Sequence, residues 1–123
     1  MDLSVYLKAL GDPTRLAIFQ QILIRRHCTR SLSMKLGISE SAVSQHLKIL
    51  RDAGMVYGVK HGYHVHHLPR QEALEDLAKA FDQMRQASRA LDENPKVCKC
   101  EFRQCAPAQY ISLCHTEEES TSE

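Results

Sequence analysis

The stretch that most constrains the fold is RSLSMKLGISESAVSQHLKILRDAG, residues 30–54. Leu32 and Leu36 lie on one face of a short predicted helix, and Gly37 follows as a residue suited to a tight turn. Ser39 then stands at the N-cap position of a longer predicted helix, whose apolar residues recur on one face until a second glycine. A short helix, a glycine turn and a serine-capped longer helix form the pattern typical of a helix-turn-helix.

Two more helices are predicted before this unit, over residues 3–10 and 13–24. Asp12 followed by Pro13 is typical of an N-cap and a first helical residue. The apolar residues of the first helix share one helical face: Leu3, Tyr6, Leu7 and Leu10. Those of the second helix are expected to be buried: Leu16, Ile18, Phe19, Ile22 and Leu23. Thr29 is expected to cap the short helix that follows.

A β-hairpin is predicted directly after the helix-turn-helix. In MVYGVKHGYHVHHL, residues 55–68, two β-prone runs flank Lys60-His61-Gly62. A hairpin in this position makes the domain a winged helix. Pro69 is then expected to open a last helix that runs from about residue 70 to residue 92.

The last predicted helix carries a stripe at alternating spacings of three and four residues: Leu74, Leu77, Phe81, Met84, Ser88 and Leu91. Such a stripe suits packing against another helix. Packing within the same domain is one interpretation, but a chain of 123 residues cannot easily cover both its first and its last helix. A homodimer is therefore favoured. The expected fold class is mainly α with a small β-hairpin, a winged helix-turn-helix that is dimeric through its first and last helices.

Positive charge is concentrated in the first part of the chain. Residues 1–68 hold nine Lys or Arg against four Asp or Glu, whereas residues 69–123 hold seven against eleven. A basic N-terminal body is the electrostatic pattern expected of a nucleic-acid-binding protein. Together with the helix-turn-helix, it predicts that double-stranded DNA is the partner.

The longer helix of the helix-turn-helix is the candidate for reading DNA bases. If its apolar residues point inward, four polar residues lie opposite: Ser41, Ser44, Gln45 and Lys48. Serine and glutamine suit base edges, and a glutamine can bond adenine in two places. Lys48 and Arg51 suit phosphates, and Ser39 lies at the helix N-terminus, where backbone amides attract phosphate.

The predicted wing supplies further candidates for DNA contact. Lys60, His61 and Tyr63 lie at its tip, where they suit the minor groove or the backbone. The wing histidines, which also include His64, His66 and His67, are ligand types that zinc accepts. Spacing along one strand fixes only two ligands well, so we interpret these histidines as facing DNA phosphates or the sheet.

The boundary of the predicted domain falls near residue 92. Residues 1–92 are expected to form the DNA-binding and dimerisation domain, and residues 93–123 a cysteine-containing C-terminal tail. No apolar run approaches the roughly 20 residues that a membrane span needs, and the first residues do not resemble a signal peptide. A cytoplasmic location and no membrane partner are therefore expected. Thiols in that compartment stay reduced, so clustered cysteines are interpreted as ligands or redox sensors.

Three stretches together resemble the ArsR/SmtB family of bacterial winged-helix repressors: LGDPTRLAIFQQIL, LGISESAVSQHLKILRDAGMV and GVKHGYHVHHL. The resemblance extends from about Leu3 to Leu91. It implies a homodimer that binds an operator when free of effector, without a cofactor. It also implies that an effector weakens DNA affinity and so releases the repressed genes.

The effector sites best known in this family have incomplete counterparts here. The family's metal box places two cysteines one residue apart in the short third helix, where this chain has Cys28 and then Arg30. Cys28 is therefore interpreted as a buried structural residue. The family's inter-subunit zinc site uses histidines of the last helix, but EALEDLAKAFDQMRQASRALDE contains none.

The remaining cysteines offer a different site, in the tail. Cys98, Cys100 and Cys105 lie within eight residues and are followed by Cys114 and His115. Three thiolates suit arsenite, As(III), or antimonite, Sb(III), and a fourth ligand makes a tetrahedral set for zinc or cadmium. Copper(I) would also accept two or three thiolates, and an iron–sulfur cluster has less support from the spacing. A thiol redox or reactive-sulfur sensor, a purely structural zinc and a tail without a role stay open as alternatives.

The sequence does not predict an enzyme. No general-base carboxylate accompanies the histidines and cysteines, and neither a nucleophile elbow nor a glycine-rich phosphate loop is present. A winged helix used only for protein interaction is the other alternative to a DNA-binding regulator. Weak DNA affinity with little salt dependence would favour that alternative.

Overall fold

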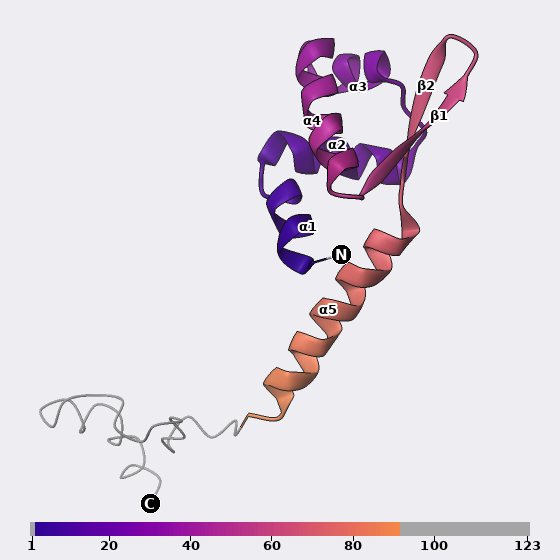
Figure 1. Ribbon diagram of the computed structural model, residues 1–123. Helices are drawn as coiled ribbons and strands as arrows, with labels where there is room; N and C mark the ends of the chain where they lie inside the picture. The colour runs from indigo at the N-terminus through magenta and orange to yellow at the C-terminus, as the bar shows by residue number, and fades with distance from the viewer. Residues whose placement is uncertain (1, 92–123) are drawn as a thin grey trace, which may run out of the picture. The chain divides into compact units, whose positions relative to one another are not determined.

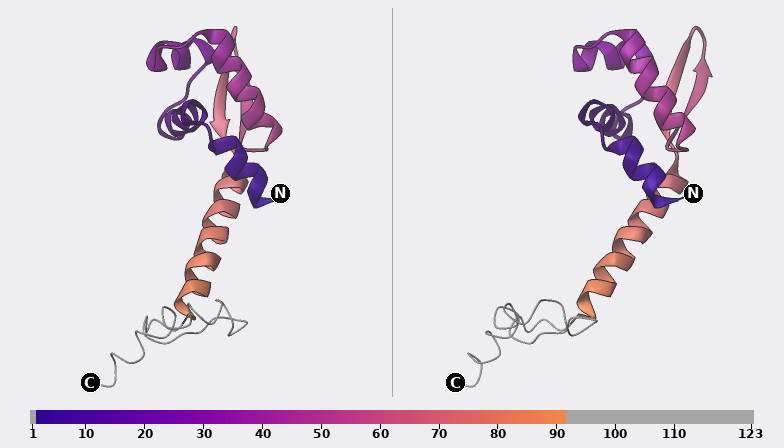
Figure 2. Two further views of the ribbon diagram at one scale, coloured as in Figure 1. Left: turned by 90° about the vertical axis from the view of Figure 1, so that its left-hand side faces the viewer. Right: turned by 60° about the vertical axis from the view of Figure 1, so that its left-hand side comes forward.

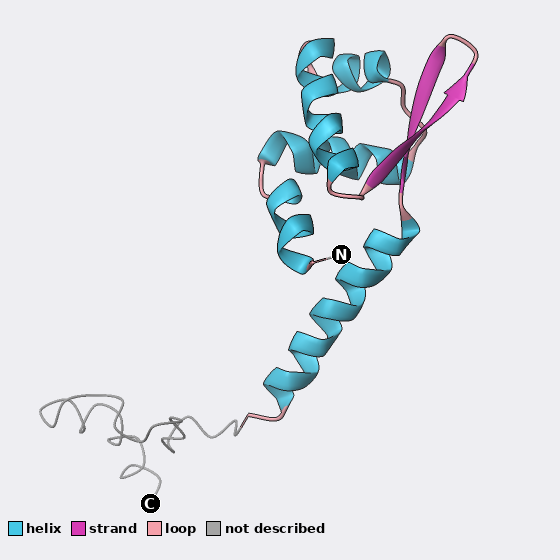
Figure 3. Cartoon of the chain, viewed as in Figure 1, coloured by secondary structure: helices cyan, strands magenta, loops and turns pink. Residues whose placement is uncertain are grey.

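The computed structural model describes residues 2–91. Its elements follow one another as α1 (Leu3–Leu10), α2 (Pro13–Ile24), α3 (Thr29–Leu36), α4 (Glu40–Asp52), β1 (Val56–His61), β2 (His64–Pro69) and α5 (Gln71–Arg89). Helices dominate and the two strands form one antiparallel hairpin (Figures 1 and 3). The predicted fold class, a mainly α winged helix-turn-helix, is confirmed.

Two compact units divide the chain, residues 1–82 and residues 83–123, and their boundary falls within α5. The first unit contains the helix-turn-helix and the hairpin. The predicted domain boundary at residues 92 and 93 lies outside the described residues and stays a prediction. Within residues 2–91, no helix combines the length and the apolar character that crossing a membrane requires.

Polar side chains begin the helices of the N-terminal half. Asp12 caps α2, since its carboxylate accepts the backbone N–H of Arg15 at 3.0 Å, and Pro13 is the first helical residue. Ser39 caps α4 in the same way through the N–H of Ala42, at 3.1 Å. Both caps confirm the predictions from the sequence.

The predicted cap of α3 is wrong by one residue. Cys28, not Thr29, is the N-cap, and its sulfur accepts the backbone N–H of Ser31 at 3.4 Å. Thr29 is already helical, so its hydroxyl is free to contact the ring of His67, 3.2 Å away. Because Cys28 takes the cap position, α3 begins at Thr29, whereas a Thr29 cap would have made Arg30 the first helical residue.

The turn between α3 and α4 depends on Gly37. This residue has a φ of +68°, a left-handed conformation that glycine adopts without steric cost. Its N–H donates to the carbonyl of Ser33 at 2.9 Å, which closes the end of α3. The glycine turn of the helix-turn-helix is confirmed.

The turn of the hairpin begins two residues later and ends one residue later than predicted. His61 is the last residue of β1 and pairs with His64, so Gly62 and Tyr63 alone form the turn. Gly62 has a φ of +66°, which allows this two-residue connection.

The long helix also differs from its predicted bounds. Pro69 ends β2 instead of opening α5, because it still pairs with Val56 across the hairpin. The helix begins at Gln71 and ends at Arg89, so Leu91 lies beyond it.

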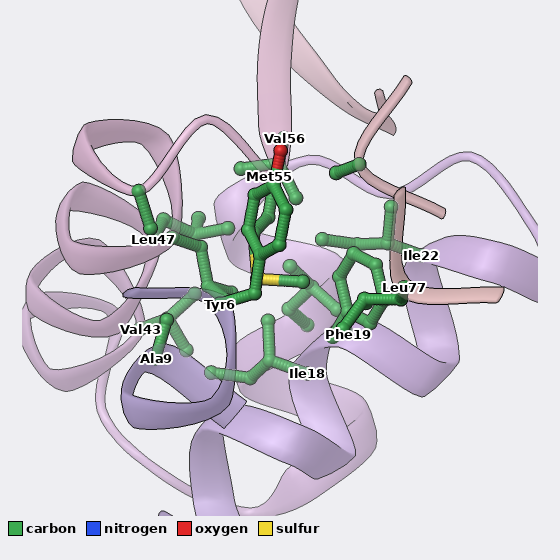
Figure 4. Packing of buried hydrophobic residues seen from close by; sticks show 14 residues of the cluster. Tyr6, Ala9, Ile18, Phe19, Ile22, Val43, Leu47, Met55, Val56 and Leu77 are labelled. Atoms are coloured by element: carbon green, nitrogen blue, oxygen red, sulfur yellow. The ribbon is translucent and has the colours of Figure 1, made fainter. Parts of the chain in front are cut away.

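One apolar core joins all the helices to the base of the hairpin (Figure 4). Its most deeply buried large residues are Ile18, Leu32, Leu47, Leu50, Met55, Val43 and Val56. The helix α1 packs against α2 and α4 and contributes Tyr6 and Ala9 (Figure 2).

Two residues predicted to be buried, Leu16 and Leu23, are exposed. Their exposed fractions are 38% and 45%, and Leu7, on the predicted apolar face of α1, has an exposed fraction of 41%. The contacts of α1 run through Tyr6 and Ala9, which leaves Leu7 at the edge of the buried face. In α2 the buried residues are Ile18, Phe19 and Ile22, so its buried face is narrower than the apolar pattern suggests.

Candidate nucleic-acid interface

The helix α4 has one buried and one exposed face. Val43, Leu47 and Leu50 are buried against the rest of the domain. The opposite face exposes the residues predicted to read bases: Ser41, Ser44, Gln45 and Lys48. The structure thus brings these four side chains together on one accessible surface, which we call the α4 polar face.

Three of the polar groups on or beside this face have partners within the chain. The Ser39 hydroxyl accepts the N–H of Ala42 and lies 3.2 Å from the hydroxyl of Ser41. The Lys48 ammonium pairs with the Asp52 carboxylate at 2.9 Å, and both side chains are well exposed. Exposed pairs of this kind contribute only about 0–1 kcal/mol, so Lys48 can exchange Asp52 for a phosphate at little cost.

The wing exposes its three predicted contact residues. Tyr63 in the turn is fully exposed, and Lys60 and His61 at the end of β1 are exposed as well. The His61 ring stacks on the His66 ring, with centroids 5.2 Å apart and planes 21° apart. This stacking fixes His61 beside the turn and leaves Tyr63 projecting into solvent.

His67 joins the wing to the segment that precedes α3 and to the start of α3, a role that the sequence did not indicate. Its backbone N–H donates to the carbonyl of His27 at 2.9 Å, and its ring nitrogen Nε2 lies 3.2 Å from the Thr29 hydroxyl. The other ring nitrogen, Nδ1, is buried without a partner in the described chain. Burial lowers the pKa of His67, and the charges of Arg51 and His66 lower it further.

Arg15 connects α4 to the first two helices. Its Nε donates to the carbonyl of Ala9 at 2.6 Å, and its Nη1 lies 3.3 Å from Nδ1 of His46. Arginine can only donate, so His46 must accept at Nδ1 and hold its proton at Nε2. His46 is therefore a packed residue that is hydrogen-bonded to α2. The role of Arg15 was missed, although it is the basic residue of the DPTR sequence that opens α2.

No group of three or more His, Cys, Asp or Glu side chains within residues 2–91 is placed to hold a metal ion. Cys28 is half-buried and caps α3, and the Ser31 N–H that bonds its sulfur lowers the pKa of the thiol. The predicted tail ligands lie outside the described residues: Cys98, Cys100, Cys105, Cys114 and His115.

Comparisons with known proteins agree with this arrangement. The family model "Bacterial regulatory protein, arsR family" matches residues 12–57, which include α2, the helix-turn-helix and the start of the wing. The solved structure of a possible transcriptional regulator for arsenical resistance has a TM-score of 0.57 and 27% identity, and the match covers 70% of this chain and 96% of that one.

Two relatives extend the comparison by sequence. The HTH-type transcriptional repressor SmtB of Mycobacterium tuberculosis (strain CDC 1551 / Oshkosh) is 41% identical over 68 residues, which are 50% of this chain and 50% of SmtB. The chain thus spans about half the length of that relative. The nodulation protein NolR of Rhizobium meliloti is 30% identical over 95 residues, which are 76% of this chain and 78% of NolR. The matched family consists of bacterial regulatory proteins and SmtB is named a transcriptional repressor, which agrees with the prediction of a regulator and not an enzyme. The chain belongs to the ArsR family of bacterial regulatory proteins.

Proposed function

We propose that the protein is a sequence-specific transcriptional repressor that inserts α4 into the major groove of its operator. The observation that carries this proposal is the α4 polar face, which is exposed on the second helix of a helix-turn-helix. A solvated polar face alone would have no such meaning. On a helix-turn-helix it is the surface that meets the base edges.

The side chains of this surface have separable roles. Gln45 is assigned to a base edge, where its amide can both donate to and accept from adenine, and Ser41 and Ser44 flank it. Lys48 and Arg51 are assigned to phosphates, and Ser39 positions the N-terminus of α4 against the backbone. The wing residues Lys60, His61 and Tyr63 are assigned to the adjacent minor groove or backbone.

The repressor is proposed to act as a homodimer in the cytoplasm. On α5, Phe81 and Met84 have exposed fractions of 51% and 50%, although both belong to the apolar stripe of that helix. On α1, Val5 and Leu7 are exposed as well. A second copy of the chain would cover these apolar side chains, and a two-fold dimer would set the spacing between two operator half-sites.

The effector is proposed to be a thiophilic metal or metalloid bound by the tail cysteines. Cys98, Cys100 and Cys105 supply three thiolates for As(III) or Sb(III), and Cys114 completes a set of four for zinc or cadmium. One relative in structure is named for arsenical resistance, which supports this chemistry. The tail follows α5 in the chain, so ligation would act on the dimer helix and alter the spacing of the two α4 helices. A thiol redox or reactive-sulfur sensor and a structural zinc tail are the alternatives.

Fluorescence anisotropy on DNA from upstream of the protein's own gene tests the repressor proposal. We expect tight binding by the reduced protein under anaerobic conditions, with an affinity that falls steeply with salt because counterions are released from the DNA. Binding that is weak and insensitive to salt would instead indicate a winged helix for protein interaction.

Titration of arsenite into the same complex tests the effector. We expect release near one equivalent per site for the wild type and for the Cys28→Ser control. The variant with Cys98→Ser and Cys100→Ser should bind DNA normally but fail to respond. An equal response of that variant would refute the tail site, and a wild-type complex indifferent to arsenite would direct the search to zinc, cadmium, copper and oxidants.

A further inference from the structure

A basic hollow lies between the end of α2 and α3. None of the residues that line it belongs to the α4 polar face. It encloses about 490 Å³ and is lined by Gln21, Ile24, Arg25, His27 and Lys35. None of these lining residues is acidic. Two permanent cations and one titratable ring therefore line a single hollow without a carboxylate among them.

The two cations are unpaired within the described chain. Arg25 uses its backbone N–H to close the end of α2 on the carbonyl of Gln21, at 3.2 Å. Its guanidinium and the ammonium of Lys35 make no hydrogen bond or ion pair with any of residues 2–91. Like charges brought around one hollow repel each other, and a bound anion would remove that repulsion.

His27 contributes a third group whose free nitrogen can be identified. Ser31 donates its hydroxyl proton to the Cys28 carbonyl at 3.0 Å, so its oxygen must accept from Nδ1 of His27, 2.8 Å away. The other nitrogen, Nε2, makes no hydrogen bond within the described residues, and His27 is one of the residues that line the hollow. Burial lowers the pKa of His27, and the charges of Arg25 and Lys35 lower it further, so an empty hollow disfavours the protonated ring.

We propose that this hollow binds a tetrahedral oxyanion of the phosphate class, held by Arg25, Lys35 and the Gln21 amide, with protonated Nε2 of His27 as a further donor. The anion offsets the two fixed charges and thereby favours the protonated ring. Binding accordingly strengthens as the pH falls. The groups that face His27 are Arg25 at the end of α2, Lys35 and the neutral hydroxyl of Ser31 on α3, and, from β2, the titratable His67, whose backbone N–H bonds the His27 carbonyl.

The oxyanion has two sources, a phosphate of the DNA backbone or a free phosphate. The helix α3 is the first helix of the helix-turn-helix, and in this motif that helix crosses the DNA backbone. A backbone phosphate is therefore the source that the position of Lys35 favours. This choice of source rests on the proposed DNA-binding function, whereas the anion site itself does not.

Titration with inorganic phosphate, in the absence of DNA, tests the site. The full-length protein is followed by NMR at the ring proton of His27, with chloride at equal ionic strength as the reference. We expect phosphate to raise the pKa of His27 in a saturable way. Arg25→Gln and Lys35→Gln should each weaken phosphate binding about fivefold, as expected for loss of one partly exposed charge contact. The matched control is Arg26→Gln. It removes an equal charge at the next residue along the chain, whose side chain does not line the hollow.

The salt dependence of DNA binding then identifies the source. If the ligand is a backbone phosphate, Arg25→Gln and Lys35→Gln should each lower the slope of log K against log salt, by at most about 0.9 because they share one phosphate, and Arg26→Gln should not. Unchanged slopes with a retained phosphate response would assign the site to a free anion. A wild-type protein that does not bind DNA would refute the proposed DNA-binding function. The NMR titration with phosphate would then decide alone whether the anion site exists.

Two results would overturn the anion site. One is a His27 response no larger in phosphate than in chloride, together with unchanged salt slopes in both variants. The other is an Arg26→Gln variant that loses as much phosphate affinity as Arg25→Gln, because the effect would then be general charge and not the hollow.

Discussion

Replacement of Arg15 by alanine should cost about 2 kcal/mol of unfolding free energy. The guanidinium donates to the Ala9 carbonyl at 2.6 Å, and hydrogen bonds to charged groups contribute about 1.5–3 kcal/mol. The 3.3 Å contact to His46 adds roughly 0.5 kcal/mol, and the 3.5 Å approach to the Lys8 carbonyl is too long to add anything. Because Arg15 is only half-buried, the total lies toward the lower end of the range.

Urea unfolding at a fixed protein concentration measures this loss, since the stability of a dimer depends on concentration. Arg26→Ala is the matched control, because Arg26 is exposed and should change the unfolding free energy by less than about 0.5 kcal/mol. The expected result is a lower midpoint for Arg15→Ala with an unchanged urea dependence. An Arg15→Ala protein as stable as the control would show that Arg15 does not join the first two helices to α4.

Three further changes have defined outcomes. Tyr6→Phe removes the hydroxyl that donates to Asp76 at 2.9 Å, so α1 loses a contact to α5 and unfolding free energy should fall by about 1 kcal/mol, measured in urea. Gly37→Ala should lower the unfolding free energy by roughly 1 kcal/mol through backbone strain alone, because φ is +68° and an added Cβ meets nothing within 4 Å. A loss of unfolding free energy above about 3 kcal/mol in the same assay would contradict this reason. The lowered pKa values of His27 and His67 mean that the unfolded chain binds more protons, so stability should fall as the pH drops below about 6.5, by at most about 1.4 kcal/mol per pH unit for each histidine. Urea midpoints that do not change between pH 7.5 and 5.5 would contradict that prediction.

Local chemistry made much of the fold predictable. Asp12, Ser39 and Gly37 act on their immediate neighbours, so the sequence alone could place the start of two helices and the turn between α3 and α4. Burial was less predictable, because it depends on which elements meet. Leu7 and Leu16 fit the helical period of the apolar face but are exposed.

Some residues of the candidate site could likewise be predicted from the sequence, and others could not. The exposed residues of α4, such as Gln45, follow directly from the buried period of that helix. The contact between Arg15 and His46 joins residues 31 apart, and that between Thr29 and His67 joins residues 38 apart. No local pattern specifies such pairs, so both had to come from the packing of whole elements.

The most direct test of the central claim, that the α4 polar face reads DNA sequence, is the affinity of Gln45→Ala for two duplexes. One duplex carries DNA from upstream of the gene and the other a scrambled version, and anisotropy is recorded at one fixed salt concentration. Gln20→Ala, which changes an exposed glutamine of α2, is the matched control. The account predicts that Gln45→Ala loses about 1–3 kcal/mol on the upstream duplex and little on the scrambled one, while the control loses nothing on either. A Gln45→Ala protein that still separates the two duplexes as well as the wild type would contradict it.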